Sequence, residues 1–169
     1  MSQATENKGD YTYALHFSID TLQFYTLYFL DCIKEICHMP TVLIEVRREY
    51  TPQQENAILE AVHSALREAF ELPEWDKDVR LVAHLPHRLM CRPGIEKPEY
   101  FTHISIDCFT GRSLDAKRNL YKAIVKNLEP LGIPNNQVKI LLRESSRENW
   151  GIRGGQAACD IDIGFTVEV

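Results

Sequence analysis

The 169-residue chain has no long hydrophobic run, no excess of positive charge and no closely spaced cysteine pair. Its longest uncharged stretch, 21–30, is shorter than the roughly 20 apolar residues that a membrane-spanning helix needs, and Asp20 and Asp31 flank it. The formal net charge of -5 argues against binding nucleic acid or an anionic membrane through bulk electrostatics. We therefore expect neither a membrane nor a nucleic-acid partner.

The cysteines are odd in number and scattered: Cys32, Cys37, Cys91, Cys108 and Cys159. Such a set is typical of reduced thiols in a cytoplasmic protein rather than of a disulfide framework or a zinc site. His84 and His87 lie close to Cys91, but their spacing fits no standard zinc pattern. The sequence also has no nucleophile elbow, P-loop or dinucleotide fingerprint. We expect no metal and no other cofactor.

Residues 1–38 differ in composition from the rest, with a polar start and then an aromatic-rich stretch from Tyr11 to Cys37. A signal peptide is not indicated, because Lys8 is offset by acidic neighbours and no small-residue cleavage site follows. This extension is either a helical appendage that packs on a partner surface or upstream sequence joined by a wrongly assigned start. The second interpretation is favoured, because the elements from Met39 onward are self-consistent.

From Pro40 the sequence repeats a strand–helix–strand pattern with a period of about 60 residues. In the first copy, 41–46 is predicted to be a strand and 79–84 the returning strand. Between them, Thr51 begins a capping box with Pro52 at the first helical position. The outward face of this helix is predicted to carry Glu55, Glu60, His63 and Glu68.

The second copy has predicted strands 103–108 and 138–142 around a helix whose N-cap is Ser113. Each copy is a βαβ unit with parallel strands, because a helix connects them. The predicted fold class is α+β: two tandem βαβ units in a four-stranded sheet, with both helices on one face. The other face lies on strands rich in Val, Ile and Leu, which predicts burial against other subunits.

The expected organisation is an extension, 1–38, followed by one domain, 40–169. That domain divides into repeat one, 40–86, a connecting loop, 87–100, repeat two, 101–155, and C-terminal strands, 156–169. The last segment is predicted to hold short strands 159–163 and 165–169 about Gly164. The glycines predicted to need positive φ in a hairpin are Gly151, Gly154 and Gly155.

Together these elements resemble the tautomerase superfamily, the group of 4-oxalocrotonate tautomerase, malonate semialdehyde decarboxylase and macrophage migration inhibitory factor. The resemblance rests on Met39-Pro40 before the first strand, the Gly111-Arg112-Ser113 turn, the returning strand at 138–140 and the hairpin at 150–155. The two-unit length is similar to the fused branch and points to malonate semialdehyde decarboxylase. The resemblance implies a homotrimer with a catalytic N-terminal proline.

By position, the resemblance implies that Pro40 is the general base or acid and that Arg112 binds a substrate carboxylate. Asp76 matches an aspartate that activates water or orients the proline. The further substrate-binding candidates are Arg80, Trp150 and Asn149. From the residues alone, Pro40 is equally consistent with a plain strand start, and Arg112 with a solvated charge in a turn.

The chemistry depends on whether the nitrogen of Pro40 is free. A free α-amino group has a pKa of about 7.7 to 8.0, suited to proton transfer at neutral pH, whereas an internal proline nitrogen is an amide. The implied function is a cofactor-free tautomerase acting on a small 2-oxo or unsaturated carboxylate, active only when Pro40 is the N-terminus. Two alternatives stay open: a hydratase or decarboxylase, and a non-catalytic trimeric binding protein whose proline pocket the extension blocks. Thr110 stands where the decarboxylase has a further arginine.

Overall fold

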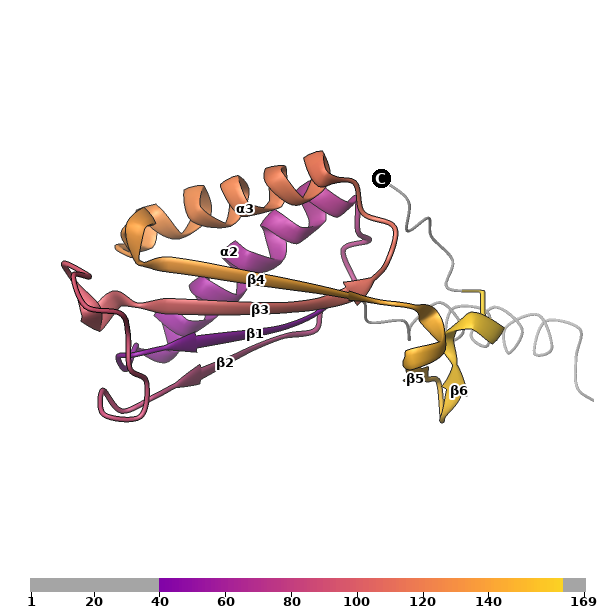
Figure 1. The fold of residues 1–169 in the computed structure, drawn as a ribbon, viewed down its shortest axis with the longest axis horizontal. Coiled ribbons are helices and arrows are strands. Elements are labelled where there is room, and N and C mark those ends of the chain that lie inside the picture. The colour runs from indigo at the N-terminus through magenta and orange to yellow at the C-terminus, as the bar shows by residue number, and fades with distance from the viewer. Residues whose placement is uncertain (1–39, 163–169) are drawn as a thin grey trace, which may run out of the picture. The chain divides into compact units, whose positions relative to one another are not determined.

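A computed structural model describes residues 40–162 of the chain. Four strands form one sheet in the order β2-β1-β3-β4, namely β1 (Thr41–Val46), β2 (Val79–Ala83), β3 (Thr102–Phe109) and β4 (Val138–Ser145). Within each unit the strands pair parallel, and the two units join antiparallel through β1 and β3. Helices α2 (Pro52–Phe70) and α3 (Leu114–Leu128) lie on the same face of the sheet (Figure 1). The predicted fold class is confirmed, whereas the predicted extension lies outside the described residues.

Both helices begin where the sequence predicts. The Thr51 hydroxyl accepts a bond from the Gln54 amide at 3.3 Å, and the Gln54 side chain accepts one from the Thr51 amide at 3.0 Å. The Ser113 hydroxyl accepts from the Ala116 amide at 3.1 Å. These bonds satisfy amides that would otherwise have no partner inside the first turn, so each helix starts at a defined residue.

The core lies between the sheet and the two helices. Along β1, alternate residues Val42, Ile44 and Val46 are fully buried beneath the helices, as period-2 alternation requires. The same alternation places Ile104 and Ile106 of β3 beside them. The helices contribute Ile58, Val62, Ala65, Leu66, Phe70, Ala116, Leu120, Ile124 and Leu128.

One outward-facing prediction is wrong. His63 is 4% exposed, and its Nε2–H donates to the backbone oxygen of Asp76 at 3.1 Å. His63 therefore lies at the edge of the buried stripe of α2 and holds the turn that follows the helix. Helical periodicity alone does not identify this role, since the partner is a backbone group that follows the end of α2.

The uncovered face of the sheet is less apolar than predicted. Leu43, Val82 and Leu141 lie on it, and Val82 and Leu141 are each 41% exposed. Between them the face carries Asp107, whose carboxylate oxygens accept bonds of 2.6 and 2.7 Å from Arg143. The Val, Ile and Leu residues of the strands mostly face the helices, because the alternation sends them to the core.

The C-terminal part of the described chain is a small hairpin of β5 (Gly151–Ile152) and β6 (Gln156–Ala157). Gly154 and Gly155 have positive φ as predicted, but Gly151 does not, and Arg153 adopts a φ of 45° instead. Cys159 and Asp160 belong to a 3-10 helix rather than to the predicted strand 159–163, and 165–169 lies outside the described residues. The 3-10 helices are η1 (Pro98–Tyr100), η2 (Glu129–Leu131), η3 (Asn135–Gln137), η4 (Arg147–Asn149) and η5 (Ala158–Asp160).

Across residues 40–162, none of the helices combines the length and the apolar character needed to traverse a bilayer.

Candidate functional site

The sheet topology brings most of the predicted site residues to one end of the domain. Pro40 precedes β1, and Thr41 pairs with Asp107 near the end of β3. The returning strand β2 begins at this end, because the Val42 amide donates to the Asp78 oxygen at 2.9 Å. Here too β3 leads into the turn that holds Arg112, and β4 leads into the hairpin (Figure 1). Residues far apart in sequence are therefore collected by the antiparallel joining of two parallel units.

Pro40 is buried. Its neighbour Thr41 begins β1, and the Thr41 hydroxyl accepts a bond from Arg80 Nη1 at 2.9 Å. Arg80 therefore binds the residue that directly follows Pro40 in the chain. In the 169-residue chain Met39 precedes Pro40, so its nitrogen is an amide and has no basic lone pair.

Arg112 is a buried cation rather than the solvated turn residue that is common in proteins, with 6% exposure. Its guanidinium carbon lies 4.7 Å from the centroid of the Phe70 ring. Burial lowers the pKa of Arg112, while the negative charges near it, including those of Asp76 and Glu144, act in the opposite direction. The group stays charged at any physiological pH, so it gives this end of the sheet a desolvated positive charge suited to a carboxylate.

Asp76 is 2% exposed and lies in the turn between α2 and β2. Two contacts fix the turn: the Asp76 amide donates to Pro73 at 3.2 Å, and His63 donates to the Asp76 oxygen. Burial lowers the pKa of His63, which favours the neutral ring that makes this bond. The charge of Asp76 also acts on Arg112, and interacting buried charges of this kind are common at catalytic sites.

Arg80 projects on the uncovered face of the sheet. Its alternation with Val79 and Leu81 places it beside Leu43 in the register, and its charge helps to lower the pKa of Asp107. Its hydrogen bond to the Thr41 hydroxyl lies on this face, away from the helices. Arg80 therefore lies at the same end of the sheet as Arg112, but on the face that the helices do not cover.

Trp150 forms an aromatic pair at the same end. Its ring meets Phe109 edge-on, with centroids 5.5 Å apart and an interplanar angle of 81°. Its indole N–H donates to the Ser145 hydroxyl at 2.7 Å. The last residue of β3 thus packs against Trp150, and the last residue of β4 orients its indole.

Asn149 is exposed, and its amide donates to the Ser146 hydroxyl at 3.3 Å. That bond closes the short helix η4, so the structure does not place Asn149 with the buried candidates. Sequence reasoning missed Arg147, which donates to the Ala158 and Ile161 oxygens and stacks 5.9 Å from the Phe109 ring. An arginine between Ser146 and Glu148 gives no signal of this role in the sequence.

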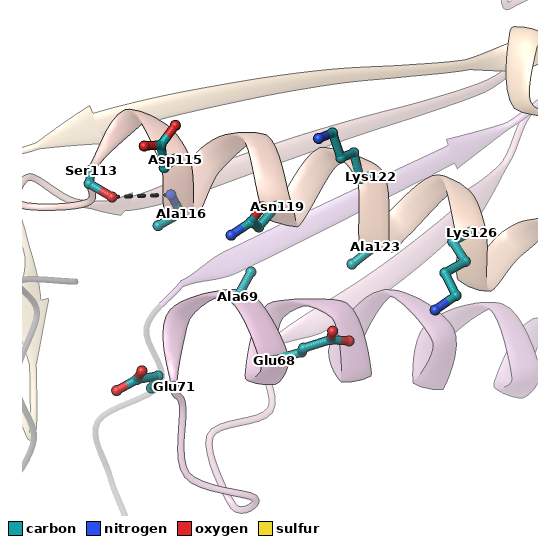
Figure 2. Close-up of a pocket in the computed structure, with 10 residues that line it drawn as sticks. All are labelled: Glu68, Ala69, Glu71, Ser113, Asp115, Ala116, Asn119, Lys122, Ala123 and Lys126. Carbon is teal, nitrogen blue, oxygen red and sulfur yellow. Dashed lines mark hydrogen bonds between the residues drawn. The ribbon is translucent and has the colours of Figure 1, made fainter.

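A separate groove of 520 Å³ lies between α2 and α3. Figure 2 shows Glu68 and Glu71 on one side and Asp115, Lys122 and Lys126 on the other. Charges of both signs line it, and Arg112 and Asp76 are not among the lining residues. The groove therefore favours no single class of ligand, and the cluster around Pro40 remains the candidate site.

Comparisons with known proteins show which family model and which folds this chain is similar to. A family model described as Tautomerase enzyme matches residues 76–153, a range that includes Asp76, Arg112 and Trp150. FG41 malonate semialdehyde decarboxylase, inhibited by 3-bromopropiolate, is 27% identical, with a TM-score of 0.60 over 65% of this chain and 86% of that one. No curated protein sequence matches the chain significantly.

Two further solved structures share the fold at lower identity. A malonate semialdehyde decarboxylase described as having decarboxylase and hydratase activities is 23% identical, with a TM-score of 0.65 over 72% of this chain and 99% of that one. A fused 4-OT, described as a symmetric trimer, is 19% identical, with a TM-score of 0.62 over 70% of this chain and 96% of that one. The described domain thus corresponds to nearly the whole length of these proteins.

Proposed function

We infer from the Tautomerase enzyme family model and from the likeness to FG41 malonate semialdehyde decarboxylase that the chain is a member of the tautomerase superfamily. On that premise we propose that it moves a proton on a small 2-oxo or unsaturated carboxylate without a cofactor. The observation that carries the proposal is that Pro40, Arg112 and Asp76 are all buried and all belong to the same end of the sheet. With a free nitrogen Pro40 supplies a base, Arg112 a cation and Asp76 a carboxylate, which are groups that acid–base chemistry on an anionic substrate uses.

In the proposed mechanism, Pro40 is the N-terminal residue and its nitrogen is a neutral secondary amine. The amine accepts the proton of a 2-hydroxyl group while the C–O bond becomes a carbonyl and the electron pair of the enol moves to carbon. The ammonium that results returns the proton to that carbon, which completes the tautomerisation. Arg112 binds the carboxylate and Trp150 excludes water from the reacting atoms.

A homotrimer is part of this proposal. Its support is the uncovered sheet face and the trimeric state of the fused 4-OT that shares the fold. Most of the charges on that face are already paired, as Asp107 is with Arg143 and Glu45 is with His84 at 3.0 Å, so the face can be buried at a lower electrostatic cost. We expect sedimentation equilibrium to give three times the chain mass, and Leu141→Lys to dissociate the assembly; a monomeric parent chain contradicts it.

The test of the proposed reaction compares three proteins: a chain that begins at Pro40 after removal of Met39, the same chain with Pro40→Ala, and the 169-residue chain. Each N-terminus is established by intact mass, and ketonisation of phenylenolpyruvate is followed by absorbance. We expect turnover only for the free proline, with a loss of about 100-fold or more in the other two. Equal rates in all three contradict a role for the proline nitrogen.

A second candidate function is hydration or decarboxylation of the malonate semialdehyde decarboxylase type. The observation that favours it is Asp76, a carboxylate with 2% exposure placed electrostatically beside Arg112, together with the 27% identity to a decarboxylase. A carboxylate in this place can activate a water molecule for addition to an unsaturated acid. A comparison of Asp76→Asn and Arg80→Ala separates the two functions and is described in the Discussion.

A further inference from the structure

A second cavity lies at the opposite end of the sheet from Pro40. Its volume is 460 Å³, and it lies beside the start of β3, since Thr102 pairs with Val46 at the end of β1. The connecting loop, whose course is seen in Figure 1 between β2 and β3, forms one wall. The apolar part of the lining includes Met90, Ile95 and Phe101, and the polar part includes Arg92, Gln137 and Lys139.

Gln137 has an unused hydrogen-bond acceptor in this lining. The side chain is 2% exposed, and its Nε2 donates to Asn136 Oδ1 at 2.9 Å. Its Oε1 is buried and accepts no hydrogen bond within residues 40–162. A buried acceptor without a donor is unfavourable, which favours a bound molecule that brings an O–H or N–H group to this atom.

The walls of the cavity are held in place before any ligand arrives. Arg47, the residue after β1, donates from Nε and Nη2 to the Pro86 oxygen at 3.2 and 3.0 Å. Its Nη1 donates to Cys91 Sγ at 3.2 Å, so one side chain ties the loop at two points. Arg48 lies 5.0 Å from the Tyr50 ring and 4.9 Å from the Tyr100 ring, which fixes the residue before Phe101. Such preorganisation lowers the entropic cost of binding.

The internal repeat makes this end of the sheet, where β3 begins, the counterpart of the Pro40 end, where β1 begins. Lys139 pairs with His103 in β3 as Arg80 pairs with Leu43 in β1, one repeat earlier. Counting back along β3 and β1 in the same way, Tyr100 takes the place of Pro40. Tyr100 lies inside the chain and supplies no basic nitrogen, so this end can bind an anion without catalysing the proton transfer proposed for the other.

We propose that this cavity binds a small organic carboxylate that carries a hydroxyl or amine donor on an apolar ring or chain. Arg92 and Lys139, both exposed at the rim, hold the carboxylate. Gln137 Oε1 accepts the ligand's donor, and the apolar body packs against Phe101 and its neighbours. The site is distinct from the proposed catalytic end and does not need the nitrogen of Pro40.

The test uses the 169-residue chain and 4-hydroxyphenylacetate, which has no 2-oxo group for the proposed reaction to act on. Calorimetry measures its Kd, and backbone amide NMR shifts locate it. We expect shifts at Ile95, Phe101 and Lys139, and a Kd about fivefold weaker for the Lys139→Ala variant. Lys122→Ala, which removes an exposed charge from α3, is the matched control and should bind as the parent does. The neutral amide of the probe should bind about fivefold more weakly for the same reason.

Three results overturn the proposal: no binding at millimolar probe, shifts confined to the hairpin around Trp150, or equal Kd for Lys139→Ala and Lys122→Ala. Gln137→Met keeps the side-chain length and removes the acceptor, so it should also weaken binding; an unchanged Kd overturns the assignment of Gln137. If that buried variant fails to fold, Arg92→Ala on the exposed loop replaces it. Pro40→Ala should leave the Kd unchanged, so failure here is separate from failure of the proposed reaction.

Discussion

The guanidinium of Arg112 lies over the ring of Phe70, with its central carbon 4.7 Å from the ring centroid. Arg112 belongs to the second repeat and precedes α3, whereas Phe70 is the last residue of α2 in the first repeat. The ring face partly compensates the cation for its lost hydration. The proposed carboxylate-binding group is therefore positioned by both copies of the repeat, and neither copy alone would hold it.

We expect Arg112→Ala, in the chain that begins at Pro40, to lower kcat/KM for an enolpyruvate by about 10- to 100-fold, the value of a charge-assisted hydrogen bond. Arg112→Lys should recover only part of the loss, because lysine keeps the charge without the planar fork. Arg118→Ala removes an exposed arginine of α3 that pairs with Asp115 and is the control. Melting temperatures identify any variant that fails to fold, and a folded Arg112→Ala with parental kcat/KM contradicts the role.

Asp76 distinguishes the two candidate reactions. Tautomerisation moves a proton without water, whereas addition of water to an acetylenic acid such as 3-bromopropiolate needs a base for that water. We expect Asp76→Asn to lower the hydration rate by about 100-fold or more and to change ketonisation much less. Arg80→Ala, which removes a charge from the same end and leaves Asp76 in place, is the comparison. If Asp76→Asn lowers both rates equally, the carboxylate serves the proline or Arg112 rather than water.

Ser145 is expected to hold the indole of Trp150 in its place at the site. Ser145→Ala removes the acceptor of the 2.7 Å bond from the indole N–H. It should lower the free energy of unfolding by about 1 kcal/mol. Trp75 is 41% exposed, so the emission of Trp150 is best measured in a Trp75→Phe background, where we expect Ser145→Ala to shift it. Ser146→Ala, whose hydroxyl accepts from Asn149, is the neighbouring control. Identical spectra for the two serine variants would contradict this role for Ser145.

Much of the fold is predictable because its signals are local. The capping box at Thr51 and the N-cap at Ser113 depend on residues within one turn, and both form as predicted. The alternation in β1 likewise predicts which of its residues are buried. The strand predicted at 159–163 fails because Arg147 binds the backbone oxygens of Ala158 and Ile161, a contact that a local pattern does not contain.

The site is only partly predictable, because its geometry depends on long-range contacts. Spacing suggested Arg112 but left open whether it is solvated, and only its packing on Phe70 decides that. His63 supports Asp76 through a backbone oxygen, so no side-chain motif marks the pair. Asn149 is a candidate by its position beside Trp150, but it is exposed. Its side-chain amide binds the Ser146 hydroxyl within the same turn.

The ion pair of Asp107 and Arg143 gives a test in which pH changes stability. Hydrogen bonds from Arg143 are the main reason that the pKa of Asp107 lies below its ordinary value, and the same bonds raise the pKa of Arg143. A lowered carboxyl pKa contributes stability above the unfolded value of about 3.9, and that contribution is lost as the pH falls through the folded value. The side chains are 35% and 51% exposed, so solvent screening limits the pair to about 1 kcal/mol or less.

We therefore expect Asp107→Asn to lower the free energy of unfolding by up to about 1 kcal/mol at pH 7, and to have progressively less effect as the pH falls below the unfolded value and through the lowered folded pKa of Asp107. Urea unfolding measures this change in free energy. The protein concentration is kept fixed, because assembly would make the stability depend on concentration. Arg143→Gln and the double variant complete a cycle that isolates the pair from Arg80, which also acts on Asp107. A coupling energy that does not decrease as the pH falls from 7 through the acid range would show that the stabilisation is not that of an ionised carboxylate.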